Sequence, residues 1–395
     1  MNTVQQLIIT LLKSAVTGEG LSLPEGVSLA DACEIIKKQG LVTLAYEGAV
    51  HCGVSRTDPV MKELFPYYYK VLLHSERQMA KVNALLGEFE KAGIDYLPFK
   101  GCVMKALYPK PELRPMGDAD ILIRMEQYDR IIPILTELGF RLEIESDCEL
   151  IWKHPDLYLE LHKCMVQPSH KDYYGYFGDG WGRSVLLEGH RYGFVPEDMY
   201  VYLFMHFAKH YRSGGIGCRH VVDLWVYRRV NGMLDWNYVN RELKKLHLEQ
   251  FHKHCERLLE AWFEDGRTDE MTEFISKRIF SGGSWGKQED YQIFCELLKL
   301  KETDKIRNSR LRYAVYLAFP PLIQIRKKYP ILHRLPFLLP AAWVLRGLTV
   351  LLHKRSKLSH AVRNGRIIDD AALNAHQEAL RVVGLEWHGQ EYSED

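Results

Sequence analysis

Apolar residues recur at helical spacing through the first quarter of the chain. This spacing predicts helices over residues 3–12, 32–39 and 60–91. Asp58 before Pro59 is a typical start for the third helix, because aspartate caps free N–H groups and proline fits the first helical turn. The later apolar positions of that helix lie on one stripe suited to packing against a sheet: Leu72, Met79, Val82, Leu86 and Phe89.

The pattern then changes from helical spacing to alternation and short apolar runs. It predicts strands over residues 94–99, 118–123, 140–144, 150–153 and 156–163. A helical pattern over 125–138 separates the second strand from the third. Strand, helix, strand and then antiparallel strands are typical of a small mixed sheet with helices on one side.

The rest of the chain is mainly helical in pattern. Residues 167–194 show no clear period and are interpreted as an irregular loop near the cleft. Further helices are predicted over residues 197–211, 219–229, 237–246, 248–264, 269–280, 287–300 and 307–317. The fold class is therefore α+β, a small mixed β-sheet core with a largely helical remainder. We expect four regions: 1–94, 95–195, 196–358 and 359–395.

Composition and charge exclude little but change the expected partners. The chain has 395 residues, of which 47% are hydrophobic, and its formal charge is +1. A net charge this close to zero does not favour nucleic acid as a partner. The eight cysteines are scattered without a C-x-x-C pair, which indicates reduced thiols in a cytoplasmic protein.

One late segment, residues 337–352, is strongly apolar. Pro340 and Arg346 interrupt it, and basic residues flank it. A buried C-terminal helix is the favoured interpretation, and peripheral membrane contact is the alternative. Residues 1–16 lack the basic start and cleavage site of a signal peptide and are expected to form a helix.

Two aspartates separated by one residue open the strand predicted over 118–123. Asp118 and Asp120 share one face of this strand, because strand side chains alternate between faces. Adjacent carboxylates repel each other, and a cation between them would remove the repulsion. Their oxygen ligands suit Mg²⁺ or Mn²⁺. The alternative is a pair of solvated aspartates in a turn.

Neighbouring residues favour a site over a solvated turn. Lys100 and Gly101 follow a predicted strand at a turn where glycine would let a phosphate approach the backbone. Arg114 lies in a short proline-containing loop before the aspartates. Glu160 lies on one face of the strand predicted over 156–163 and would add a third carboxylate.

Taken in order, these motifs resemble the polymerase-β-type nucleotidyltransferase superfamily. Within it they are most similar to a branch of largely uncharacterised nucleotidyltransferases, often associated with polysaccharide-biosynthesis gene sets. The chain departs from the superfamily pattern at Cys102, where serine or a second glycine is usual, and in a longer gap before the first aspartate. The resemblance rests on Phe99-Lys100-Gly101, Leu107-Tyr108-Pro109, Arg114-Pro115-Met116, Asp118 to Ile123 and Leu159 to His162.

The resemblance implies a metal-dependent nucleotidyltransferase. Such an enzyme moves a nucleoside monophosphate from a nucleoside triphosphate to an acceptor, here an unknown small molecule, sugar or protein. It implies that Asp118, Asp120 and Glu160 are the catalytic residues and the ligands of Mg²⁺ or Mn²⁺. Glu160 is also a candidate base for the acceptor hydroxyl.

Four residues are expected to bind the nucleotide: Lys100, Gly101, Arg114 and His210. The alternatives are ordinary surface charge for Lys100 and Arg114 and a plain turn glycine for Gly101. His206 and His210 share one face of a predicted helix, which is compatible with a zinc site, a pocket wall or structural histidines.

The sequence leaves alternatives open for the role of His162 and for the function of the protein. His162 would either orient Glu160 or lie in solvent. The main alternative function is a catalytically inactive nucleotide-binding partner in a glycan-assembly complex, for which Cys102 and the long gap before the first aspartate are the main support. A metal-dependent phosphohydrolase would also use clustered carboxylates.

Overall fold

The computed structural model describes most of the chain. The described residues are 1–168, 171–213, 216–264, 266–283, 315, 318–320, 322–325, 329–353 and 370–386. The chain divides into two compact units, residues 1–287 with 388–395 and residues 288–387. The helices expected over 287–300 and 307–317 lie outside the described residues, apart from Val315. The division into four regions stays a prediction.

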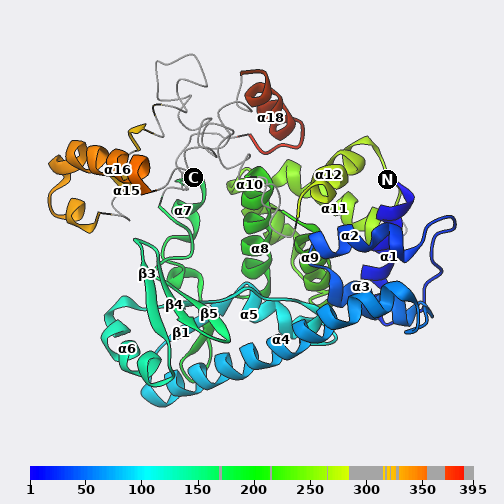
Figure 1. Ribbon diagram of the computed structural model, residues 1–395, viewed down its shortest axis with the longest axis horizontal. Coiled ribbons are helices and arrows are strands. Elements are labelled where there is room, and N and C mark those ends of the chain that lie inside the picture. The colour runs from blue at the N-terminus through cyan, green and yellow to red at the C-terminus, as the bar shows by residue number, and fades with distance from the viewer. Residues whose placement is uncertain are drawn as a thin grey trace. The chain divides into compact units, whose positions relative to one another are not determined.

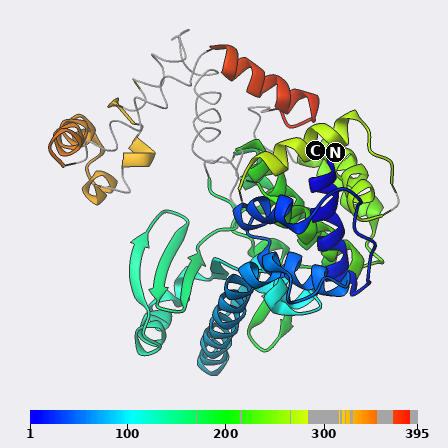
Figure 2. The same ribbon diagram turned by 45° about the vertical axis from the view of Figure 1, so that its right-hand side comes forward.

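The first unit begins with helices. They are α1 (Thr3–Thr17), α2 (Leu29–Lys38), α3 (Val42–His51) and α4 (Pro59–Ala92). Asp58 caps α4 by accepting a hydrogen bond from the Val60 N–H, and Pro66 lies inside the helix as the sequence predicts. The Gln39 side chain donates to the carbonyl oxygen of Ile279, so the N-terminal helices lie beside a helix that comes 240 residues later (Figures 1 and 2).

A seven-stranded mixed sheet forms the centre of this unit. Its strands are β1 (Tyr96–Phe99), β2 (Asp118–Ile123), β3 (Arg141–Glu145), β4 (Glu149–His154), β5 (Leu157–His162), β6 (Val185–Glu188) and β7 (Arg191–Gly193). Their order is β3-β4-β5-β2-β1-β7-β6. The β2–β5 and β1–β7 pairs are parallel and the others are antiparallel. The mixed sheet and the surrounding helices confirm the α+β class.

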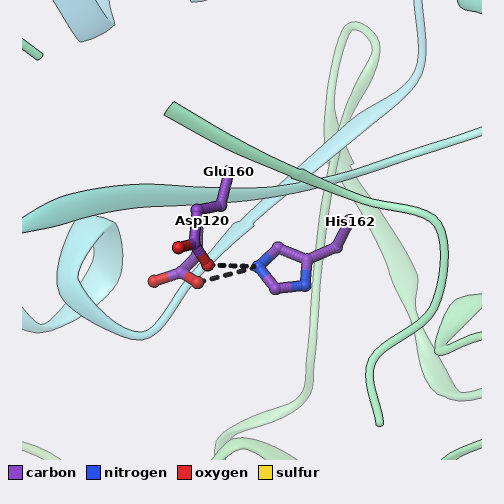
Figure 3. Close-up of side chains that lie close together, drawn as sticks. All are labelled: Asp120, Glu160 and His162. Atoms are coloured by element: carbon purple, nitrogen blue, oxygen red, sulfur yellow. Dashed lines mark hydrogen bonds and ion pairs between the residues drawn. The ribbon is translucent and has the colours of Figure 1, made fainter. Parts of the chain in front are cut away.

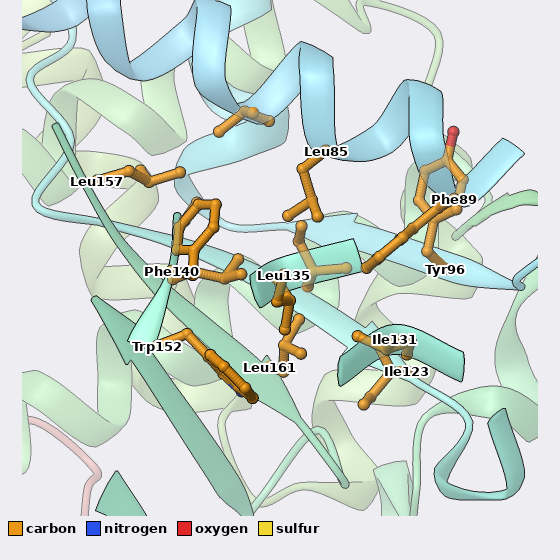
Figure 4. Close-up of a cluster of buried hydrophobic side chains, with 14 of the residues drawn as sticks. Leu85, Phe89, Tyr96, Ile123, Ile131, Leu135, Phe140, Trp152, Leu157 and Leu161 are labelled. Carbon is orange, nitrogen blue, oxygen red and sulfur yellow. The ribbon is translucent and has the colours of Figure 1, made fainter. Parts of the chain in front are cut away.

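One face of the sheet packs against α4 and against α6 (Tyr128–Glu137). Figure 4 shows α4 crossing this face, with Leu85 and Phe89 directed at the strands. The apolar side chains of β2 and β5 that point to this face are buried: Ala119, Ile121, Ile123, Leu157, Leu159 and Leu161. Alternation along the strands therefore leaves their polar residues on the opposite face.

The prediction of helices on one side only is wrong. Helix α8 (Pro196–Arg212) contacts the opposite face, where the Phe99 ring packs edge-on against Tyr202 with centroids 5.7 Å apart. Phe99 also contacts the His162 ring at 4.8 Å. The polar face of the sheet is therefore covered by a helix at the end where the aspartates lie.

The interpretation of residues 167–194 as an irregular loop is also wrong. This segment contains α7 (Lys171–Phe177), β6 and β7. Strand β7 joins the sheet beside β1 through the pair Tyr96 and Arg191. The β6 side chains are exposed, Leu186 by 57%, so the hairpin lacks the apolar alternation that a half-buried strand would show.

Helices complete the described structure. The first unit adds α5 (Gly101–Met104), α9 (Cys218–Val230), α10 (Trp236–Lys245), α11 (Glu249–Phe263) and α12 (Glu270–Ser281), and the second contains α15 (Leu322–Ile325), α16 (Leu339–His353) and α18 (Asp370–Val382). The predicted helices over 219–229, 237–246, 248–264 and 269–280 are confirmed. Among the described residues, none of the helices has the length and apolar character needed to cross a bilayer.

Candidate active site

Strands β2 and β5 bring two carboxylates side by side. They run parallel with Asp120 opposite Glu160 and Asp118 opposite Tyr158. Because Ala119 and Leu159 point into the core, the acidic side chains project together from the other face. The register thus brings together residues 40 positions apart in the sequence.

His162 completes a compact group with these carboxylates. In Figure 3 its ring faces both carboxylates, with Nε2 2.8 Å from Asp120 Oδ1 and 3.6 Å from Glu160 Oε2. One ligand atom from each of the three residues lies within 4.8 Å of the others. His162 is only 3% exposed, which contradicts the interpretation as a solvated strand histidine. Its closest acidic partner is Asp120, so it orients this residue more directly than Glu160.

Lys100 approaches the same carboxylate from β1. Its Nζ atom lies 2.5 Å from Asp120 Oδ1, and its backbone has a φ of 47°, which is uncommon for a residue with a side chain. Burial alone would raise the pKa of Asp120, but the Lys100 charge and the hydrogen bond with His162 outweigh it and lower that pKa to about 2. Asp120 is therefore held as an anion.

The pKa of Asp118 is shifted in the opposite direction to that of Asp120. Burial raises its pKa first, the negative charges of Asp120 and Glu160 add to this effect, and the pKa reaches about 6. Like charges close together in a buried site are relieved by a cation. The donor set of carboxylate oxygens with one imidazole fits a divalent ion such as Mg²⁺ or Mn²⁺.

Gly101 has a packing role at the turn after β1. A Cβ atom at this position would lie 2.7 Å from Arg114 Nη1 and 2.9 Å from Met116 Cγ, closer than side chains tolerate. Glycine is therefore needed for the Arg114 guanidinium to approach the turn. Gly101 therefore makes room for Arg114, and it also lines the pocket in which the sequence places the phosphate.

Arg114 is buried and paired with a helix beyond the sheet. Its Nη2 lies 3.0 Å from Asp223 Oδ2 on α9, and its Nε donates to Asp223 Oδ1 at 3.3 Å. The Tyr108 hydroxyl also donates to Asp223 Oδ1 at 2.7 Å. Ordinary surface charge is therefore the wrong interpretation of Arg114, which connects the loop before β2 to α9.

These residues line one pocket with a volume of about 210 Å³. All seven residues that the sequence indicated border it: Lys100, Gly101, Arg114, Asp118, Asp120, Glu160 and His210. Helices α8 and α9 supply the other wall: Leu203, His206, Phe207, Lys209, Arg219, His220, Asp223 and Leu224. The pocket therefore has an acidic sheet side and a wall rich in nitrogen donors.

The histidines of that wall are uncharged. The Nε2 atoms of His206 and His210 are 3.0 Å apart, and burial lowers the pKa of each well below its usual value, with nearby cationic groups adding to the effect. Burial likewise lowers the pKa of His220 to about 3, with Arg219 and Arg114 contributing. Lys209 and Arg219 stand beside these imidazoles in the same wall, and their positive charges suit an anion.

Arg219 and His220 are pocket residues that sequence reasoning missed. They stand in the first turn of α9, after Gly217. A positive charge is disfavoured at a helix N-terminus, because the backbone N–H groups there carry partial positive charge. A basic residue at that position was therefore a usable signal, although periodicity alone does not reveal it.

Comparison with known proteins assigns the chain to a family. The model of a family described as uncharacterised nucleotidyltransferase matches residues 27–264, more than half of the chain. No curated protein and no solved structure gives a significant match. The matched region contains β1, β2 and β5 together with α8 and α9. The chain therefore belongs to this family of uncharacterised nucleotidyltransferases.

Proposed function

We propose that this protein is a divalent-metal-dependent nucleotidyltransferase acting in the cytoplasm. It transfers a nucleoside monophosphate from a nucleoside triphosphate to a small molecule, a sugar or a protein. The observation that carries the proposal is the pairing of Asp120 with Glu160 across parallel strands, with Asp118 on the same pocket wall. The described cysteines form no disulfide, which supports the location.

Asp118, Asp120 and Glu160 would hold Mg²⁺ or Mn²⁺. The like-charge repulsion that raises the pKa of Asp118 is the physical reason for an ion in this position. When bound, the metal neutralises charge on the triphosphate and activates the acceptor oxygen. His162 keeps the Asp120 carboxylate turned toward the pocket through its 2.8 Å contact.

The reaction joins the acceptor oxygen to the α-phosphorus and breaks the bond to the bridging oxygen of the departing pyrophosphate. Glu160 takes the proton that the acceptor hydroxyl loses. The other pocket residues position the reactants and balance their charge, which is the main part of catalysis in phosphoryl and nucleotidyl transfer.

Lys100, Gly101, Arg114 and His210 would bind the nucleotide. Lys100 lies at the carboxylate cluster, and its ammonium is a donor for phosphate oxygens at the same end of the pocket. Arg114 keeps its Nη1 next to the Gly101 turn while Asp223 holds the rest of its guanidinium. His210 contributes a neutral imidazole from the opposite wall.

The test is incubation with each labelled nucleoside triphosphate, Mg²⁺ and cell extract, followed by measurement of pyrophosphate and of labelled products. Asp118→Asn keeps the size of the side chain and should abolish both. Asp147→Asn is the matched control, because Asp147 is exposed in the turn between β3 and β4. Full activity of the Asp118 variant would refute the proposal.

The second candidate is a nucleotide-binding partner without catalysis. Cys102 favours it, because a thiol is a weaker hydrogen-bond donor to phosphate oxygens than the serine hydroxyl usual at this position. Triphosphate binding in calorimetry, without pyrophosphate release in any extract, would identify this function. Release of inorganic phosphate would instead indicate a phosphohydrolase.

A further inference from the structure

The charge of this chain is distributed very unevenly. Between Asp304 and Asp369 the sequence has no acidic residue and fourteen lysines and arginines. The whole chain has a formal charge of only +1, so the remaining sequence is acidic overall. Such asymmetry within a near-neutral protein indicates a local anionic partner.

Helix α16 (Figure 1) lies in this basic stretch, and several of its apolar side chains are exposed. Val344 is 63% exposed, Leu345 55% and Leu348 51%. With the exposed Ala341 they follow the spacing i, i+3, i+4 and i+7, which places them on one side of the helix. Phe337, in the turn before the helix, is 72% exposed.

The opposite side of α16 is already packed within the second unit. Ala342 is buried against Ile325 and Leu332, and Leu339 and Trp343 pack on the same cluster. The Trp343 Nε1–H donates to the carbonyl oxygen of Pro320 at 2.9 Å. The outward apolar face is thus a separate surface.

We propose that this face of α16 docks on the surface of an anionic lipid bilayer. Aliphatic side chains would enter the headgroup boundary, and lysines and arginines of the same sequence stretch would contact lipid phosphates. A nucleic acid would match the charge but leave the aliphatic side chains without a partner, because its backbone and base edges are polar. A second copy of the chain would place two basic segments against each other.

The test is co-sedimentation of the full chain with vesicles of phosphatidylcholine alone or mixed with phosphatidylglycerol. We expect binding only to the mixed vesicles, and weaker binding as salt increases. Val344→Ser with Leu345→Ser and Leu348→Ser should lower the affinity by about tenfold or more. Val230→Ser with Met233→Ser should leave it unchanged, because these residues are similarly exposed in the first unit.

A variant with fewer positive charges separates the electrostatic contribution to membrane binding from the apolar contribution. Lys354→Gln with Arg355→Gln and Lys357→Gln should reduce binding by about fivefold for each charge removed. No binding to mixed vesicles would overturn the proposal, as would equal binding by the serine variant. Binding of labelled RNA or DNA without vesicle binding, or dimers that the serine variant abolishes, would overturn it in favour of those partners. If a variant fails to fold, the lipid and salt dependence of the wild-type protein decides the question.

Discussion

Asp120 shows how single residues set the character of this site. Its Oδ1 atom contacts both Lys100 Nζ and His162 Nε2, and it stands beside Glu160 in the sheet. These partners fix the carboxylate in one orientation within a buried site. A ligand that is held in place before binding loses less entropy when it binds.

The role of His162 is testable at this scale. His162→Leu removes the 2.8 Å contact with Asp120 and should weaken Mn²⁺ binding by about 10- to 100-fold, the usual effect of losing a group that orients a metal ligand. Calorimetric titration with Mn²⁺ measures this change. His154→Leu, on the neighbouring strand β4, is the control and should bind as the wild type does. Unchanged affinity of the His162 variant would show that it plays no orienting part.

The sequence could predict which residues share a face, but not all their contacts. Alternation alone put Asp118 and Asp120 together and separated them from the core. The match of Asp120 with Glu160 depends on the parallel pairing of β2 with β5, which no local pattern encodes. The clash that requires glycine at position 101 comes from Arg114, a contact between residues separated in sequence.

At the scale of elements, the Arg114–Asp223 ion pair fastens the loop before β2 to α9. Both side chains are about 10% exposed, so breaking the pair leaves a charge buried without its partner. Asp223→Asn should therefore cost about 3–5 kcal/mol of unfolding free energy. Arg114→Met combined with Asp223→Leu should recover much of this loss, because neither charge of the pair is then left buried without its partner.

Urea denaturation of the single and double variants measures these energies. The exposed Lys91–Glu88 pair is the control, and Lys91→Met should cost less than about 1 kcal/mol. A loss of similar size at both pairs would contradict the role given to Arg114.

Helices and strands whose apolar residues recur at regular spacing could be predicted from the sequence. Those without such spacing could not. Helices α4, α10, α11 and α12 have clear apolar stripes or side-chain caps, so their existence followed from the sequence. Strand β6 exposes all its side chains and β7 has only three residues, so the hairpin carries no alternation that local reasoning can detect. Its place in the sheet comes from backbone pairing with β1.

At the scale of the whole molecule, buried neutral histidines make stability depend on pH. Burial, together with Arg228, lowers the pKa of His252 to about 3, and the Tyr200 hydroxyl lies 2.9 Å from its Nε2. Glu256 lies 3.8 Å from its Nδ1 but does not reverse this effect. Below pH 6.5 the unfolded chain gains a proton at this position and the folded protein does not, so stability falls as the pH falls.

His252→Gln should reduce this acid sensitivity. Between pH 7 and pH 5 the wild-type protein should lose about 2 kcal/mol more unfolding free energy than the variant. Urea denaturation at the two pH values measures the difference. Identical losses in both proteins would mean that His252 is protonated in the folded state.

Binding of Mn²⁺, followed by electron paramagnetic resonance, tests most directly whether the acidic pocket holds a divalent cation. The wild-type protein and Asp147→Asn should bind the ion with equal affinity, whereas Asp120→Asn and Glu160→Gln should each weaken binding by about 100-fold while keeping the wild-type circular dichroism spectrum. Equal Mn²⁺ binding by all four proteins, or no binding by the wild type, would contradict the account.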